Sequence, residues 1–252
     1  MKISIITICY NSASTIRDTF ESILMQTYSE IEYVVIDGNS EDGTISLIQE
    51  YEAKFNGRMR WISEPDDGIY DAMNKGILLS SGELIGILNS GDIYYDKNVL
   101  RDIVFKIKKS SADTLYGDIE FVKSNDINVV LRKWISSPFM QGSFKRGWHP
   151  PHPCFFVKKK CYERFGIFDT SFEVSADFEL MLRFLEKHKA STIYYNRLMV
   201  KMRLGGESTG SIGKIVIGNL GILKAFRKNE IEVSFLYPIY RLAPKLLQFI
   251  RK

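Results

Sequence analysis

One polar turn early in the chain offers oxygen atoms that suit a divalent cation. Residues 87–92 read Ile-Leu-Asn-Ser-Gly-Asp, so an apolar segment ends in a turn that closes on Asp92. A carboxylate at this place can hold Mg²⁺ or Mn²⁺, because both ions prefer hard oxygen ligands, and the ion can neutralise charge on a departing diphosphate. The same turn also occurs in ordinary loops and helix caps, so the motif alone does not define a site.

Asp37 is a second candidate, and its position suggests nucleotide binding. It follows the apolar run of residues 34–36 and precedes Gly38. An acid after the second strand of an α/β sheet can accept hydrogen bonds from a ribose or a base edge, although it can also satisfy its own turn. The chain has neither a Gly-x-Gly-x-x-Gly fingerprint after its first predicted strand nor a P-loop. A nucleotide binder without them needs another phosphate contact, which a cation at Asp92 would supply.

His149 and His152 are separated by two prolines. The prolines prevent a helical pair of metal ligands, so metal binding by these histidines is disfavoured. The surrounding residues 136–153 are rich in Gly, Pro, Ser and His and predict a long functional loop.

The elements that must position these residues follow from hydrophobic periodicity. Strands are predicted over residues 3–9, 31–36, 58–62 and 83–88, with a helical pattern after each of the first three. This alternation predicts a mostly parallel, doubly wound sheet. Ligands bind such sheets beyond the carboxyl ends of the strands, which is where Tyr10, Asp37 and Asp92 fall.

The pattern after Asp92 is less regular. A helix is predicted over residues 99–107, and strands over 114–122 and 128–134 suggest a hairpin around residues 124–126. A short strand over 154–157, a helix over 176–187, a strand over 191–202 and a helix over 212–226 follow. Residues 235–252 mix apolar residues with four basic ones and contain no acid.

Composition sets further bounds on the class of protein. The 252 residues are 45% hydrophobic and 25% charged, as in ordinary globular proteins, and the net charge of +4 is too small to indicate nucleic acid binding. The three cysteines, Cys9, Cys154 and Cys161, have no metal-site spacing and predict free thiols in a reducing cytoplasm. The apolar N-terminal run predicts a buried strand and not a signal peptide, and no apolar run is long enough to span a bilayer.

Taken in order, four segments resemble the family 2 glycosyltransferases of the GT-A fold. They are ISIITICYN, VVIDGNSEDGT, SEPDDGIYDAMNKG and SSGELIGILNSGD, and HPCFFVKKKCYERFGIFDTSFEVSADFELMLR is similar to the second half of the family. The likeness is greatest to bacterial enzymes for capsule, exopolysaccharide or O-antigen repeats, of the colanic acid glycosyltransferase type. It implies a Rossmann-like domain over residues 1–209, with a nucleotide-sugar half to about residue 95, an acceptor half from about 96, and a helical tail over 210–252.

The resemblance implies a donor site at the strand ends. It assigns Thr7, Tyr10 and Asp37 to a nucleoside pocket and Asp92 to the metal. Further donor contacts are implied for Asp67, Asn74, Lys75, Asn89 and Arg203, the last toward phosphate. The chain departs from the family where Asp-Ser-Asp-Asp is common, since it reads Asn-Ser-Gly-Asp. Metal binding would then rest on one carboxylate and on the diphosphate itself.

The resemblance also implies a catalytic carboxylate. Asp177, in Ser-Ala-Asp-Phe, matches the family's general base, which takes the proton of an attacking acceptor hydroxyl and so gives inversion at the anomeric carbon. An alternative is that Asp177 only caps the helix that follows it. His152 is expected on the acceptor side, because the family often has a histidine before this strand.

These expectations predict a metal-dependent, inverting hexosyl- or N-acetylhexosaminyltransferase. The donor is a nucleotide-diphosphate sugar, with UDP favoured by the resemblance, and the acceptor is a saccharide or lipid-linked saccharide of bacterial surface polysaccharide synthesis. A nucleotidyl- or phosphotransferase is one alternative, although residues 9–15 lack the basic side chain that it would need. A catalytically inactive nucleotide-sugar binding module is another, favoured by the missing carboxylates at positions 89 and 91.

The C-terminal tail indicates where the protein acts. Arg241, Lys245, Arg251 and Lys252 lie among apolar residues, a composition that suits an anionic bilayer surface. We therefore expect a cytoplasmic protein that is peripheral at the inner membrane. Packing of the tail on the core or on a partner chain, including a second copy, is the alternative.

Overall fold

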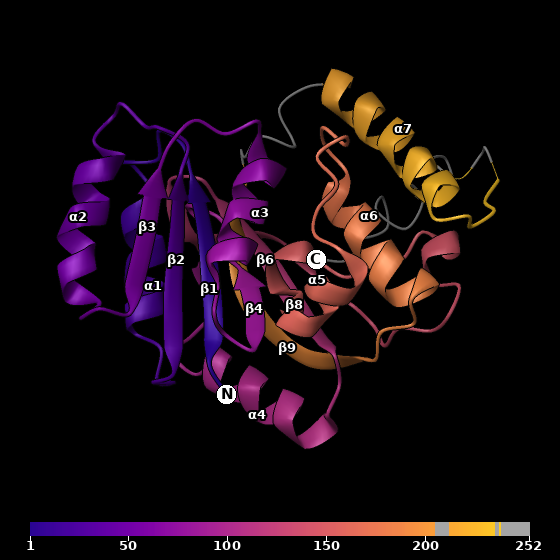
Figure 1. The fold of residues 1–252 in the computed structure, drawn as a ribbon, viewed down its shortest axis with the longest axis horizontal. Helices are drawn as coiled ribbons and strands as arrows, with labels where there is room; N and C mark the ends of the chain where they lie inside the picture. The colour runs from indigo at the N-terminus through magenta and orange to yellow at the C-terminus, as the bar shows by residue number, and fades with distance from the viewer. Residues whose placement is uncertain (205–211, 235–236, 238–252) are drawn as a thin grey trace.

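The chain folds into one curled sheet with helices on both faces (Figure 1). The computed structural model describes residues 1–204, 212–234 and 237. Within this part the strand order is β3-β2-β1-β4-β8-β6-β9-β5, and β7 pairs with β6 outside that path. The first four strands of this order are parallel, which confirms the predicted α/β fold.

The parallel half brings several strand ends to one edge. It comprises β1 (Ile3–Cys9), β2 (Ile31–Asp37), β3 (Met59–Ser63) and β4 (Leu84–Ile87), connected by α1 (Ile16–Leu24), α2 (Thr44–Lys54) and α3 (Ile69–Leu79). Every residue of β1, β2 and β4 is buried, because helices cover both faces of these strands. The register pairs Cys9 with Asp37 and Asp37 with Ser63, so the polar residues after these strands lie together.

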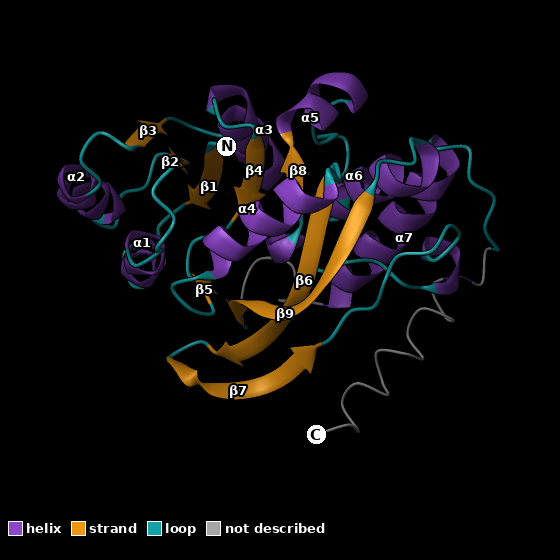
Figure 2. Ribbon diagram, turned by 90° about the horizontal axis from the view of Figure 1, so that it is seen from below, coloured by secondary structure: helices purple, strands orange, loops and turns teal. Residues whose placement is uncertain are grey.

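The second half of the sheet is mixed. β8 (Phe156–Lys158) runs antiparallel between β4 and β6 (Thr114–Lys123), and β6 pairs in parallel with β9 (Thr192–Arg203). β7 (Asp126–Trp134) forms the predicted hairpin with β6, and β5 (Ile93–Tyr94) pairs with β9. Figure 2 shows β6 and β9 as long, curved strands, with β7 along their outer side.

Helices complete the second half. They are α4 (Val99–Ser110), α5 (Lys159–Phe165), α6 (Ala176–Leu182), which continues as a π-helix over Arg183–Lys187, and α7 (Ile212–Lys228). Two short turns, η1 (Phe144–Arg146) and η2 (His152–Cys154), lie in the loop predicted over residues 136–153. In Figure 1, α7 lies beside α6 at the margin of the molecule.

Two apolar cores lie on opposite faces of the sheet. Ile5 belongs to the core beneath α1, α2 and α4, whereas the adjacent Ile6 belongs to the core beneath α3, α6 and α7. Successive side chains of a strand point to opposite faces, so each central strand supplies both cores. Packing against the two cores thereby holds the ends of the central strands in fixed positions.

Several local expectations are settled by the structure. Cys9, Cys154 and Cys161 are buried and unbridged, as predicted. The elements β5 and α5 were not predicted, and Lys159, which begins α5, donates to the Ser80 carbonyl over 2.8 Å. No helix in the described part of the chain is long and apolar enough to cross a membrane. The tail over 235–252 lies outside the described residues except Tyr237, which is buried and donates to the Phe144 carbonyl over 2.7 Å.

Candidate active site

Asp37 lies at the centre of the edge formed by the strand ends. Its carboxylate is fully buried and accepts hydrogen bonds from the Ser40 amide at 2.9 Å, the Ser40 hydroxyl at 2.5 Å and the Ser63 hydroxyl at 2.7 Å. Both oxygens are therefore engaged with the loops after β2 and β3. Asp37 organises this edge in the ligand-free protein, and its contact with a nucleoside stays a prediction.

Tyr10 and Asp66 flank the backbone at Gly38. Tyr10 is 65% exposed, and a Cβ atom added at Gly38 would lie 3.1 Å from the Asp66 carboxylate and 3.5 Å from the Tyr10 ring. Asp66 is thus directed toward Gly38 at the end of β2, whereas the predicted Asp67 is exposed and its amide donates to Asp71 over 3.2 Å. The resemblance covers Glu64, Asp66 and Asp67 of this loop, and only Asp67 was chosen as a donor contact, because adjacent acids in a loop give no periodic signal of direction.

Lys75 holds the acidic loop against α3. Its ammonium group lies 2.7 Å from Asp66, 2.9 Å from Glu64 and 2.9 Å from the Pro65 carbonyl. These partners raise the pKa of Lys75 above its usual value, so the residue stays charged. Its predicted contact with the donor remains open, and in this structure it fixes the loop that would meet the donor.

The turn after β4 contains the predicted metal residue. Asp92 is 4% exposed, and one carboxylate oxygen accepts a hydrogen bond from the Arg203 amide at 3.1 Å. Burial raises the pKa of Asp92 to about 7, and Arg203 offsets part of this rise. In the same turn, the Asn89 amide oxygen and the Ser90 hydroxyl are buried without hydrogen-bond partners. Unpaired buried polar atoms of this kind require an explanation, and a bound ion is one.

The donor set of this turn fits a hard cation with few protein ligands. It offers one carboxylate, one amide oxygen and one hydroxyl, which are oxygen ligands that Mg²⁺ and Mn²⁺ accept. Among the residues that the structure describes, no group of three or more His, Cys, Asp or Glu side chains is placed to hold a metal. This agrees with the departure from Asp-Ser-Asp-Asp seen in the sequence, and it leaves coordination positions for a diphosphate.

Arg203 braces the same turn from the end of β9. Its guanidinium donates to the Gly91 carbonyl over 2.8 Å and to the Ser124 carbonyl over 2.6 Å, and it pairs with Asp18. All three nitrogens therefore have protein partners. The predicted phosphate contact of Arg203 stays a prediction, and the observed contacts give it a supporting role for the Asp92 turn.

Thr7 supports that turn from beneath. It is fully buried in β1, and its hydroxyl donates to the Leu88 carbonyl over 2.7 Å. This bond connects β1 to the chain that leaves β4. Donor contact by Thr7 stays a prediction.

Asp177 contacts a tyrosine from a distant part of the chain. It is half-buried in the first turn of α6, and the Tyr70 hydroxyl of α3 lies 3.3 Å from its carboxylate and 2.8 Å from the Val174 carbonyl. The Asp177 charge also acts on the imidazole of His152. Burial lowers the pKa of His152 below its usual value despite that charge, so its imidazole is neutral at pH 7.

Asn74 locks this arrangement. Its amide nitrogen donates to the Phe168 carbonyl and its amide oxygen accepts from the Phe168 amide, both at 2.9 Å. The Phe168 ring stacks on Tyr70 at 5.6 Å and meets the His152 ring edge at 5.7 Å. Asn74 thus positions the residues around Asp177, and the predicted contact between Asn74 and the donor remains open.

Aromatic side chains of the 136–153 loop continue from Asp177 into the acceptor half. His149 meets Phe178, the neighbour of Asp177, at 5.5 Å, and it meets Trp134 at 5.1 Å. Glu186 anchors the loop by accepting from the Gln141 side chain at 2.6 Å and from the Gly142 amide at 2.8 Å. Partly exposed aromatic rings beside a carboxylate suit a ligand with both apolar and hydroxyl faces.

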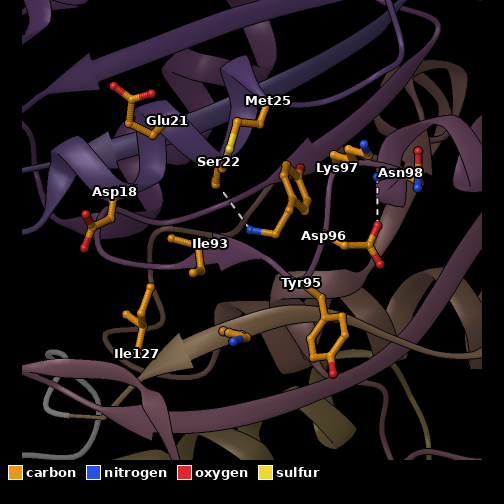
Figure 3. A pocket seen from close by; sticks show the side chains of 12 residues that line it. Asp18, Glu21, Ser22, Met25, Ile93, Tyr95, Asp96, Lys97, Asn98 and Ile127 are labelled. Atoms are coloured by element: carbon orange, nitrogen blue, oxygen red, sulfur yellow. Dashed lines mark hydrogen bonds between the residues drawn. The ribbon is translucent and has the colours of Figure 1, made fainter.

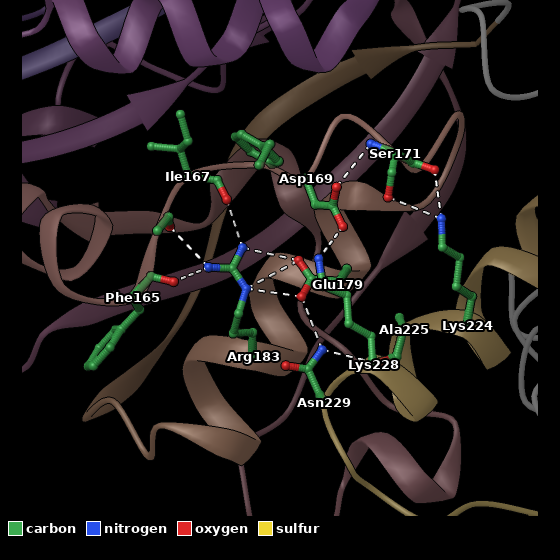
Figure 4. A network of polar contacts seen from close by, with 12 residues as sticks. Phe165, Ile167, Asp169, Ser171, Glu179, Arg183, Lys224, Ala225, Lys228 and Asn229 are labelled. Carbon is green, nitrogen blue, oxygen red and sulfur yellow. Dashed lines mark hydrogen bonds and ion pairs between the residues drawn. The ribbon is translucent and has the colours of Figure 1, made fainter.

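A charged network fixes α6 to its surroundings (Figure 4). Glu179 is fully buried, pairs with Arg183 at 3.0 Å and accepts from Asn229 at 3.0 Å. Arg183 also donates to backbone carbonyls of residues 165–167, including Ile167 at 2.8 Å. These bonds join α6, the chain after α5 and the end of α7, so the helix that carries Asp177 is held from several sides.

A cavity of about 640 Å³ lies apart from this set of residues. It is bordered by α1, β5 and the chain after β5, and Figure 3 shows Asp18, Met25, Ile93 and Tyr95 among its lining side chains. Its carboxylates already have partners: Asp18 pairs with Arg203, and Asp96 pairs with Arg197 at 2.7 Å. The cavity therefore adjoins the support of the Asp92 turn and does not contain the predicted catalytic residues.

The sheet, the strand-end acids and the acidic turn after β4 are together those of a glycosyltransferase fold. The family model described as "Glycosyl transferase family 2" matches residues 4–159. The chain belongs to this family. An uncharacterized glycosyltransferase of Mycobacterium tuberculosis is 31% identical over 190 residues, covering 72% of this chain and 68% of that protein. A PGL/p-HBAD biosynthesis glycosyltransferase of the same species is 26% identical over 220 residues, covering 84% and 80%.

Solved structures share the fold. Staphylococcus aureus TarS 1–349 in complex with UDP-GlcNAc superposes with a TM-score of 0.68 at 18% identity, covering 98% of this chain and 72% of that one. A mannosyltransferase of Pyrobaculum calidifontis in complex with GDP-Man and Mn²⁺ gives 0.66 at 18% identity, covering 97% and 69%. A longer TarS chain is covered over only 44% of its length. These similarities establish a curled α/β glycosyltransferase fold for this chain.

Proposed function

We propose that the chain transfers a hexosyl or N-acetylhexosaminyl group from a UDP-sugar to a saccharide hydroxyl, with inversion and with Mg²⁺ or Mn²⁺. The observation that carries the proposal is the 3.3 Å approach of the Tyr70 hydroxyl to Asp177 across 107 residues of sequence. Tyr70 begins the helix that follows the donor-side loop. The candidate base of the acceptor half therefore stands next to the donor half.

The strand ends support a nucleotide donor. The exposed Tyr10 ring offers a face for a base, and Asp66 and Asp37 offer carboxylates for a ribose or a base edge. UDP is favoured because one structural neighbour was solved with UDP-GlcNAc, although another was solved with GDP-Man. The exposed Asp67 lies in the same loop and remains a further candidate for donor contact.

Asp92, Asn89 and Ser90 are the residues that would hold the cation. Bound there, the ion would supply neutralisation of the charge that develops on the leaving diphosphate. The chain's own part is to hold these oxygens in place, through the hydrogen bonds of Arg203 to Gly91 and Asp92. Burial of Asp92 also excludes water that would weaken its attraction for a cation.

Asp177 performs the proton step. The oxygen of the acceptor hydroxyl attacks the anomeric carbon and forms the new glycosidic bond, while the bond from that carbon to the diphosphate oxygen breaks. The electron pair of the broken bond leaves with UDP, and the hydroxyl proton moves to the Asp177 carboxylate. Because attack and departure occur on opposite sides of the carbon, the configuration inverts. The neutral His152 lies on the acceptor side of the carboxylate.

The acceptor is a saccharide, either free or linked to a lipid. The support is the series of partly exposed aromatic rings that runs from His149 to Trp134 and Trp148. A role in bacterial surface polysaccharide synthesis, at the cytoplasmic side of the inner membrane, fits the composition of the basic and apolar tail. The nucleotidyltransferase alternative is weaker, because the loop after β1 has no basic side chain between residues 9 and 15.

The test is a donor panel with a matched pair of variants. Purified protein is incubated with UDP-GlcNAc, UDP-Glc, UDP-Gal, GDP-Man or dTDP-rhamnose, with Mn²⁺ or EDTA and with p-nitrophenyl glycosides as acceptors, and nucleotide release is measured. We expect metal-dependent release from a UDP-sugar. Asp177→Asn should lower turnover by about 100-fold or more while donor binding, measured by calorimetry, is kept.

Glu173→Gln is the control, since Glu173 is an exposed carboxylate four residues before Asp177. It should turn over like the wild type. Donor binding without turnover in any sample would support the inactive binding module instead. Full turnover in Asp177→Asn would remove this residue from the role of base.

A further inference from the structure

We infer that Tyr70 positions the carboxylate of Asp177. Because Tyr70 lies on α3, this helix connects the loop of residues 64–67, which precedes it, to the proposed base Asp177. The inference rests on the proposed function, because it requires that Asp177 takes the acceptor proton. It goes beyond that function by giving a role to a tyrosine that lies in one of the segments shared with the family but to which no role was assigned.

The hydroxyl of Tyr70 is shared between two acceptors. It lies 2.8 Å from the Val174 carbonyl and 3.3 Å from an Asp177 carboxylate oxygen. Burial and the Asp177 charge both raise the pKa of Tyr70 well above its usual value, so the phenol stays protonated and acts as a donor. Its single proton can serve either acceptor or be divided between them. Tyr70 thereby ties Asp177 to the backbone just before α6.

The ring of Tyr70 has little freedom to move. The residue is 8% exposed, and the ring stacks on Phe168 with centroids 5.6 Å apart and planes 24° apart. The backbone of Phe168 is in turn clamped by both amide atoms of Asn74, which lies one helical turn after Tyr70 on the same helix. The hydroxyl is therefore held in one direction by groups that do not themselves touch Asp177.

The same helix is fastened to the donor loop. Lys75 of α3 holds Glu64 at 2.9 Å and Asp66 at 2.7 Å, and Asp66 abuts Gly38 beside the exposed Tyr10. Tyr70 lies between this loop and Lys75 in the sequence. A shift of the loop toward a bound donor is thus transmitted through α3 to the hydroxyl that contacts Asp177.

This contact affects the base in two ways. A hydrogen bond to a carboxylate stabilises its charged form, which is the form that accepts a proton. It also restricts the carboxylate to the rotamers that the hydroxyl can reach, and base catalysis depends on such geometry. The Asp177 charge also acts on His152, whose pKa burial keeps below its usual value, so His152 places no positive charge beside the carboxylate at pH 7.

The test is a double-mutant cycle on nucleotide release from the UDP-sugar found active in the donor panel. Tyr70→Phe removes only the hydroxyl. We expect kcat to fall about tenfold with KM for the donor unchanged, since a single hydrogen bond is lost at the reacting group only. The acidic limb of the kcat profile should move to higher pH. In an Asp177→Asn background, Tyr70→Phe should cause no further loss.

Tyr162→Phe is the matched control, because Tyr162 is a buried tyrosine of α5 away from Asp177. It should leave kcat and the pH profile unchanged, and melting curves should show that all variants fold. Equal fold-losses from Tyr70→Phe with and without Asp177 would make the role of Tyr70 merely structural and overturn the inference. Wild-type kcat in Tyr70→Phe, with Asp177→Asn inactive, would overturn this inference and leave the proposed function standing. An active Asp177→Asn variant would overturn both.

Discussion

At the residue scale, the turn of residues 89–92, which contains the predicted metal residue Asp92, carries buried polar groups in the ligand-free protein. Asp92 is 4% exposed, its carboxylate has one described hydrogen bond, and the side-chain oxygens of Asn89 and Ser90 have none. Each such group costs stability, because it has lost water without gaining a full set of partners. Proteins retain such groups mainly where function needs them, and substitutions there often stabilise the fold at the expense of activity. A cation bound to all three groups would offset this cost.

The first prediction concerns Asp92 and the dependence of stability on pH. The folded protein holds the Asp92 proton up to about pH 7, whereas a free aspartate releases it near 3.8. The folded state then binds more protons between these values, so stability falls as pH rises across this window. Asp92→Asn has no proton to lose. In EDTA, its free energy of unfolding should exceed that of the wild type by about 3–4 kcal/mol at pH 8, as an upper figure, and equal it near pH 4.

Urea unfolding at both pH values measures this difference. Asp42→Asn is a suitable control, because Asp42 is an acid whose pKa is lowered by the hydrogen bonds it accepts from Thr44 and Ala13. Its substitution should act in the opposite direction and destabilise at pH 8. A wild type with the same stability at pH 4 and pH 8, and no gain in Asp92→Asn, would show that Asp92 ionises as easily in the fold as in water.

At the element scale, α3 joins the two halves of the site. Its first turn carries Tyr70, its middle carries Asn74 and Lys75, and Gly76 allows it to approach β1 so closely that an added Cβ would lie 2.4 Å from Ile6. The helix therefore contacts the sheet, the loop of residues 64–66 and the segment before α6. Its sequence must satisfy all three contacts.

A second prediction tests the clamp that α3 makes. Asn74→Ala leaves the buried amide and carbonyl of Phe168 without partners, so the free energy of unfolding should fall by roughly 2–4 kcal/mol. Asn128→Ala, at an exposed position of β7, is the control and should change stability by less than about 0.5 kcal/mol. Chemical denaturation distinguishes the two. A loss as small as that of the control would mean that water satisfies the Phe168 backbone as well as Asn74 does.

Much of this element pattern was predictable from the sequence. Buried strands show as apolar runs, such as residues 33–36 of β2, and the polar residue that follows a run marks the strand end, as at Asp37. The contact of Tyr70 with Asp177 was not predictable, because no local pattern connects residues 107 apart. The sequence also does not reveal which side chains of a loop point into the protein. Asp66 points inward and Asp67 outward, although both are acids in one turn. The partners of Arg203 required the packing of β9 against the Asp92 turn.

At the scale of the whole molecule, charge is unevenly distributed along the chain. Residues 210–252 contain eight basic and two acidic residues, a net charge of +6, whereas the full chain carries only +4. The part of the chain before residue 210 is therefore slightly negative. Such asymmetry suits a protein that binds an anionic surface through its C-terminal part. Each basic residue near an anionic bilayer contributes about 1 kcal/mol to the binding free energy.

The third prediction tests this asymmetry without removing the tail. Deleting residues 235–252 would also remove the buried Tyr237 and its bond to Phe144, so a loss of binding could follow from a damaged fold. Replacing Arg241, Lys245, Arg251 and Lys252 with Gln keeps Tyr237. Sedimentation with phosphatidylglycerol vesicles should then fall by about a thousandfold in partition coefficient at low salt, the equivalent of four basic contacts.

A matched variant decides whether position or total charge matters. Lys108, Lys109, Lys123 and Lys133 are exposed lysines outside the tail, and replacing all four with Gln removes the same charge. If the tail is the docking segment, this control keeps most of the vesicle binding, and wild-type protein fails to bind uncharged phosphatidylcholine vesicles. Equal losses of vesicle binding in both variants would mean that net charge alone causes the binding, because long-range attraction depends on the total charge of the protein when no segment lies at the surface. If the wild type does not bind phosphatidylglycerol vesicles, the protein does not meet its acceptor at an anionic bilayer. Packing of the tail on protein is then favoured.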